Sequence, residues 1–114
     1  MTAKTFRRIA LGMEGAVEGA HMSHPDFRAN GKIFATIHPD NEQGMVKITP
    51  EQQERFVREH SGMFHPAAGA WGRAGATTVH LRAADKSTVR KALTAAWCNT
   101  APQTLARQLE IPPL

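Results

Sequence analysis

Apolar residues recur at helical spacing near both ends of the chain. One stretch covers residues 3–13, with apolar residues at Phe6, Ile9, Ala10 and Met13. A second stretch follows Asp85, with apolar residues at Val89, Leu93 and Trp97. This spacing predicts two helices that each bury one face, and Asp85 can cap the second. Between them, Thr49-Pro50-Glu51-Gln52 combines a cap, a first-turn proline and a capping-box glutamine, so a further helix is predicted to begin there.

The remaining apolar residues lie in short segments typical of strands. Asn30-Gly31 between apolar residues predicts a two-residue hairpin turn joining strands at 26–29 and 32–37. Further strands are expected at 17–22, 45–48 and 77–82, with loops at 38–44 and 61–75. The order α-β-β-β-β-α-β-α predicts an α+β fold with two layers, an antiparallel sheet with helices on one face. Side chains alternate between the two faces of a strand. The set expected to face the helices is Val46, Ile48, Val79 and Leu81. The set expected to face away is Lys47, Thr78, His80 and Arg82.

The segment before the last strand combines glycines with a tryptophan. Gly69, Gly72 and Gly75 flank Trp71 and Arg73. Turn chemistry favours a tight loop held by a buried Trp71. The functional alternative is that the loop presents Arg73 to a phosphate or an acidic partner. The glycines do not match a phosphate-binding loop, which ends in Gly-Lys-Ser/Thr and precedes a helix.

Length and charge place limits on the kind of protein. The 114 residues predict a single domain over residues 1–109 with a tail at 110–114. Pro102 is expected to end or kink the last helix before a short helical turn at 103–109. No apolar run approaches the roughly 20 residues of a membrane helix. One cysteine and no signal-like N-terminus favour a cytoplasmic setting. The net charge of +4 falls entirely in residues 61–114, which favours a polyanion partner and equally fits a mildly basic surface.

No residue set indicates catalysis or metal binding. The six histidines are scattered without a Cys/His cluster, and the single Cys98 follows Trp97 late in a helix, where cysteine packs as a small apolar residue. We therefore expect no metal, no cofactor and no enzymatic activity. The oligomeric state is not defined by the sequence, and a monomer is compatible with it.

Several motifs in this order resemble the MmcQ/YjbR family. They are His24-Pro25-Asp26-Phe27-Arg28, Gly31-Lys32-Ile33-Phe34-Ala35, Val46-Lys47 with Thr49-Pro50-Glu51-Gln52, Trp71-Gly72-Arg73-Ala74-Gly75-Ala76-Thr77 and Ala96-Trp97. The resemblance runs from about Phe6 to Ala101. It implies a CyaY-like (frataxin-like) fold and DNA binding through a motif termed the double wing. It carries no catalytic residues.

Two functions remain open from the sequence. The first is a non-enzymatic DNA-binding domain that contacts mainly the phosphate backbone through the polar side of the sheet and the loop tip. Its expected nucleic-acid contacts are Lys32, Lys47, Arg73, Thr78, His80 and Arg82. The alternative is a small-molecule or protein-interaction module with a pocket between the Trp71 loop and residues 21–27.

Overall fold

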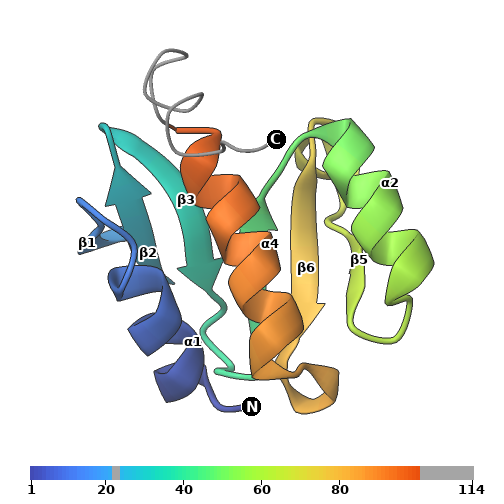
Figure 1. Ribbon diagram of the computed structural model, residues 1–114, viewed down its shortest axis with the longest axis horizontal. Helices are drawn as coiled ribbons and strands as arrows, with labels where there is room; N and C mark the ends of the chain where they lie inside the picture. The colour runs from blue at the N-terminus through green and yellow to red at the C-terminus, as the bar shows by residue number, and fades with distance from the viewer. Residues whose placement is uncertain (22–23, 101–114) are drawn as a thin grey trace.

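The computed structural model describes residues 1–21 and 24–100, which form a sheet with three longer helices and one short one (Figure 1). The helices are α1 (Ala3–Leu11), α2 (Pro50–Glu59), α3 (Gly69–Arg73) and α4 (Lys86–Cys98). The strands are β1 (Val17–His21), β2 (His24–Ala29), β3 (Lys32–Ile37), β4 (Gln43–Lys47), β5 (Phe64–Pro66) and β6 (Ala76–His80). The predictions for residues 101–114, including the short helical turn and the tail, lie outside the described residues.

The strands form one antiparallel sheet in the order β1-β2-β3-β4-β6-β5, so β1 and β5 are its edges. The first four strands follow one another as a meander. β6 pairs with β4, although α2 and β5 lie between these two strands in the sequence. The predicted α+β class is confirmed, and the predicted elements follow one another in the predicted order.

The loop predicted at 61–75 is wrong in two places, because it contains β5 and α3. The chain turns back along β6 there, with the N–H of Ala67 donating to the carbonyl of Ala76 at 2.9 Å. Pairing of this kind joins residues that local composition cannot connect. At the other end of β6 the strand stops at His80, and Arg82 lies in a 3₁₀ turn, Leu81–Ala83, instead of the strand.

The local signals in the sequence explain the elements that were predicted. Thr49 and Gln52 form the expected capping box at the start of α2, and the Asp85 carboxylate accepts the N–H of Thr88 at the start of α4. Asn30 and Gly31 have φ angles of 54° and 76°, which a two-residue turn of the primed type requires.

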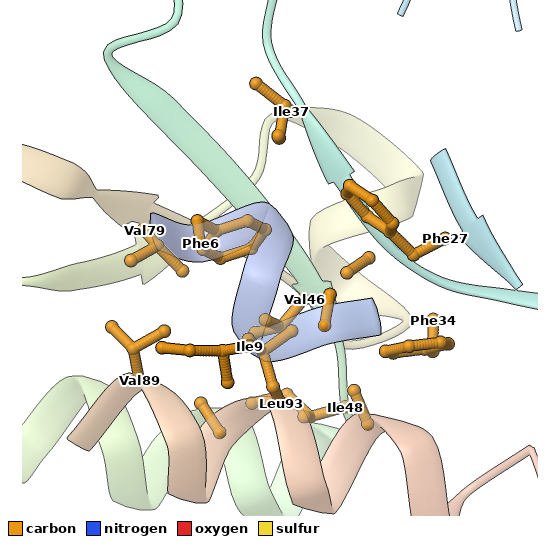
Figure 2. Packing of buried hydrophobic residues seen from close by; sticks show 14 of the residues in the cluster. Phe6, Ile9, Phe27, Phe34, Ile37, Val46, Ile48, Val79, Val89 and Leu93 are labelled. Atoms are coloured by element: carbon orange, nitrogen blue, oxygen red, sulfur yellow. The ribbon is translucent and has the colours of Figure 1, made fainter. Parts of the chain in front are cut away.

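The core lies between the sheet and the layer made by α1 and α4 (Figure 2). Phe6 and Ile9 of α1 and Val89 and Leu93 of α4 point toward the strands, and Figure 1 shows α4 crossing the sheet. The four strand residues expected to face the helices are all buried: Val46, Ile48, Val79 and Leu81. Phe6 fills the space that Gly44 leaves on β4, where a Cβ would come within 2.9 Å of its ring.

Candidate functional site

The sheet face away from α1 and α4, called here the open face, is defined by the strand register. One row of paired residues runs across all six strands on this face: Gly19, Asp26, Thr36, Met45, Thr78 and His65. The neighbouring row, which includes Phe27, Ala35 and Val46, is buried against the helices. Alternation along each strand therefore separates a packed face from a face available to ligands.

The Trp71 segment is fixed against the sheet by close backbone contacts. A Cβ at Gly72 would lie 1.7 Å from the carbonyl oxygen of Ala67, and one at Gly75 would lie 1.8 Å from that of Ile48. The side-chain amide of Gln53 on α2 lies within hydrogen-bond distance of Gly72 O, Ala76 O and Thr77 Oγ1, at 2.9, 3.0 and 3.2 Å. These contacts anchor the loop without using the tryptophan ring.

Trp71 itself is 60% exposed, so the expectation of a buried ring holding the loop is wrong. The glycines and Gln53 do the anchoring, which leaves the indole available at the surface. The Nζ of Lys47 lies 5.8 Å from the centroid of this ring, within the range of a cation–π contact. Trp97, expected in the core, is partly buried and packs against it, and its indole N–H donates to Glu14 O at 2.8 Å.

A pocket of about 250 Å³ lies on the open face beside Trp71. Ile33 and Met45 line it from the strands, and His24 and His38 line it on the side of β2 and β3. The polar groups that reach it are the side chains of Thr36, Gln43 and Thr78 and the imidazoles, including His21. This is the concave site that the alternative reading of the sequence placed between the Trp71 loop and residues 21–27.

Histidines concentrate at the same end of the open face. His21 is paired with His24 across β1 and β2, and the rings of His24 and His38 are 5.8 Å apart. On the other edge, His80 Nε2 lies 2.7 Å from His65 Nδ1. Desolvation, and then the nearby His80, lower the pKa of His65. Within residues 1–21 and 24–100, no group of three or more His, Cys, Asp or Glu side chains is arranged to hold a metal ion.

Asp26 is the one carboxylate in the row of paired residues on the open face, and Arg28 neutralises its charge. Asp26 is completely buried, and its two oxygens accept hydrogen bonds of 2.8 and 3.1 Å from Arg28. The hydrogen bond from Arg28 lowers the pKa of Asp26, while burial opposes this shift. Gly19 leaves room for the pair, because a Cβ there would come within 3.0 Å of the Asp26 carboxylate.

The six residues predicted to contact nucleic acid do not form one surface. Lys32 and Lys47 line a small depression at one end of the sheet, and Arg73 is exposed on α3. Thr78 lies in the Trp71 pocket, and His80 is engaged by His65. Arg82 lies beyond the opposite end of β6, near α1, so the length of a five-residue strand, roughly 15 Å, separates it from Lys47.

Six cations lie instead on the two helices that cover the sheet. We call α1 and α4 with their exposed charges the basic helix layer; its cations are Lys4, Arg7, Arg8, Lys86, Arg90 and Lys91. Neither helix contains an acidic residue. All ten acids and eight of the fourteen cations lie elsewhere, so the rest of the chain has a net charge of −2. Among the described residues, only Arg7 of these six cations makes a salt bridge, with Glu18 at 3.1 Å.

Two grooves run along the ridge of α4. The first, of about 390 Å³, lies between α1 and α4 and is lined by Arg8, Lys86 and Arg90 together with Thr5 and Thr94. The second, of about 580 Å³, lies between α2 and α4, and Arg90, Thr94 and Lys91 line it. Cations and hydroxyl groups therefore border hollows on both sides of one helix, an arrangement that can follow a chain of phosphates.

The sequence contained a signal for this layer. Lys4 and Arg8, and Lys86 and Arg90, are each four residues apart, so each pair shares one helix face. That the two faces meet depends on the packing of α1 on α4, which no local pattern predicts. The described part of the chain has no helix that is both long and apolar enough to cross a bilayer.

Comparisons with known proteins agree with this fold. A family model described as YjbR matches residues 11–99. The chain is similar to the crystal structure of Deinococcus radiodurans protein DR2400, a DUF419-domain protein, with a TM-score of 0.75 and 14% sequence identity. That alignment covers 97% of this chain and 89% of that one. The comparison with curated proteins gave no significant match.

Proposed function

The chain belongs to the YjbR family, and from this premise we propose that it is a non-enzymatic DNA-binding domain whose basic helix layer contacts the phosphate backbone. Family membership, expected from the motifs in the sequence, makes the DNA-binding role implied by that resemblance the first function to consider. We further propose a cytoplasmic setting for it.

The observation that supports this role is the segregation of charge. Six cations and no acids occupy α1 and α4, while the rest of the chain is net negative. A polyanion is attracted to a surface of one sign and steered toward it from a distance. Arg8, Lys86 and Arg90 already lie around one groove, so binding would not require the chain to bring them together.

The contacts expected here are to phosphates and carry little sequence information. α4 presents Lys86, Arg90 and Lys91 on its exposed side but no row of Asn or Gln residues to read base edges. With about four phosphate contacts, the logarithm of the affinity should fall against the logarithm of salt concentration with a slope of about −3 to −4. We therefore expect similar affinity for duplexes of unrelated sequence.

The test compares two triple variants of equal net charge by fluorescence anisotropy with a labelled duplex at several salt concentrations. The first replaces Arg8, Lys86 and Arg90 by Gln; the second replaces by Gln Lys32, Lys47 and Arg73, which lie away from the basic helix layer. The first should reduce the steepness of the salt dependence by about 2 to 3 and the second should leave it nearly unchanged. Loss confined to the second variant would move the interface to the residues predicted from the sequence. Absence of binding by the unmodified protein at low salt would exclude the function.

A further inference from the structure

The Trp71 pocket lies on the open face, opposite the basic helix layer, and is not used by the proposed DNA contact. Its lining is mostly apolar, with Ile33 and Met45 from the strands and the indole of Trp71 from α3. At about 250 Å³ it is smaller than the pockets of roughly 300 Å³ or more that hold drug-sized molecules. The volume therefore suits a ligand of one or two fused rings.

The exposed indole indicates the shape of the ligand. Trp71 is 60% exposed although Gly72 and Gly75 press its backbone against the sheet. The backbone that carries the ring is thus held in place while a large part of the ring surface is uncovered. Aromatic rings pair favourably in offset or edge-on arrangements, so a flat ring gains a contact here that an aliphatic group of similar size does not.

The charges around the pocket indicate an acidic ligand. Lys47 lies next to the pocket, in the depression that it lines with Lys32; its Nζ is 5.8 Å from the indole centroid and makes no salt bridge with a described residue. Of the carboxylates on this side, Asp26 is paired with Arg28 at 2.8 Å, and Asp40 accepts a hydrogen bond from the N–H of Glu42 at 2.8 Å. A negative group beside Trp71 would therefore meet an available ammonium.

We propose that the Trp71 pocket binds a small planar aromatic acid, with its ring against Trp71 and its anionic group directed to Lys47. Thr36, Gln43 and Thr78 supply hydrogen bonds to polar atoms of the ring system. This site is separate from the basic helix layer, so it stands or falls independently of DNA binding.

The test uses the indole N–H signals of the two tryptophans in ¹H–¹⁵N spectra of the full chain. Indole-3-acetate is the probe, indole-3-acetamide has the same ring without the charge, and cyclohexylacetate has the charge without a flat ring. Indole-3-acetate should shift the Trp71 signal to saturation and leave Trp97, whose N–H is bonded to Glu14 O, in place. The other two compounds should bind at least tenfold more weakly.

Variants separate the ring contact from the charge contact. Lys47→Gln should weaken indole-3-acetate about tenfold and leave indole-3-acetamide unchanged, whereas Lys32→Gln, at the same end of the sheet, should change neither. Trp71→Ala, followed through the ligand's own signals, should abolish binding of both. The proposal is overturned if no Trp71 shift occurs at millimolar probe, if both tryptophans shift together, or if the uncharged or non-planar compound binds as well as the acid.

Discussion

The two faces of the sheet differ in what covers them and in which charges they carry. One face is sealed by α1 and α4, whose inner sides are apolar and whose outer sides hold six cations. The other is partly covered by α3 and holds a pocket, with histidines at one end, Lys47, and a neutralised Asp26–Arg28 pair. Charge counted along the sequence assigned the positive excess to residues 61–114; charge counted by layer places it on two helices from opposite ends of the chain.

This difference shows that helices which seal a core also create an outer surface of their own. The inner side of a helix is constrained by packing, and the outer side is free to carry any polar residue. In this chain the charged residues on these outer sides are all cations. The open face is constrained differently, because its pocket needs both exposed apolar groups and polar groups at fixed places.

The largest expected effect tests the sealed face. Phe6→Ala should lower the free energy of unfolding by about 3–5 kcal/mol, because Phe6 is fully buried and its ring fills the space over Gly44. Chemical denaturation measures this. Leu11→Ala in the same helix, at a position 38% exposed, is the control and should cost less than about 1.5 kcal/mol. Similar losses would mean that α1 is not packed as described.

The next effect concerns the backbone that carries Trp71. Gly75 has a φ of 115° and approaches Ile48 O too closely for a Cβ, so Gly75→Ala should cost about 2–4 kcal/mol through strain and overpacking. Gly69 has a φ of 70°, and a Cβ there would have nothing within 4 Å. Gly69→Ala should therefore lower the free energy of unfolding by only about 1 kcal/mol. Thermal unfolding of both variants checks this; a smaller loss at Gly75 than at Gly69 would contradict the close approach.

The third effect tests the carboxylate on the open face. Asp26→Asn should cost about 1–3 kcal/mol, because it leaves part of a buried hydrogen-bonded pair unsatisfied. The pKa of Asp26 is lower in the folded protein than its ordinary value of 3.8. Its stabilising contribution is therefore complete above that value and is lost as the pH falls through the lower folded pKa.

Urea unfolding between neutral pH and pH 2 measures this dependence. The variant should lose less stability than the unmodified protein over the acid part of the range. Glu42→Gln is the control, since Glu42 is exposed and makes no salt bridge with a described residue. If the unmodified and Asp26→Asn proteins lost equal stability in acid, the Asp26–Arg28 pair would not contribute to the pH dependence of folding.

The smallest expected effect distinguishes the two tryptophans. Trp71→Ala should change stability by less than about 1 kcal/mol, because most of the ring is exposed and the loop is held by Gln53 and the glycines. Trp97→Ala should cost more, since that ring packs against the core and donates a hydrogen bond to Glu14 O. A large loss of stability for Trp71→Ala would show that the ring is buried, and would contradict the pocket described beside it.

The sequence predicted those parts of the fold that depend on near neighbours. The capping box of Thr49 and Gln52 and the Asn30-Gly31 turn act within a few residues, and both are present as expected. By contrast, β5 exists because of its pairing with β6, and its three residues carry no distinctive pattern. The exposure of Trp71 was missed for the same reason, because Gln53, far away in sequence, takes over the anchoring of the loop.

The candidate site was harder to predict than the fold. The alternative pocket was expected between residues 21–27 and the Trp71 loop, and His21, His24 and Trp71 do line one pocket. Met45 and Thr78, which also line the pocket, are brought together by the register of β4 on β6. The basic helix layer needs α1 and α4 to lie together, although their closest residues in sequence are 75 positions apart.

The two edges of the sheet have a consequence for how the molecule behaves among its own copies. β5 has only three residues and ends in Pro66, which has no N–H to offer a neighbouring strand. β1, on the other side, is held at Glu18 by a salt bridge to Arg7. Short, proline-ended or charged borders discourage a second chain from extending the ladder, so crowding should not convert this fold into stacked strands.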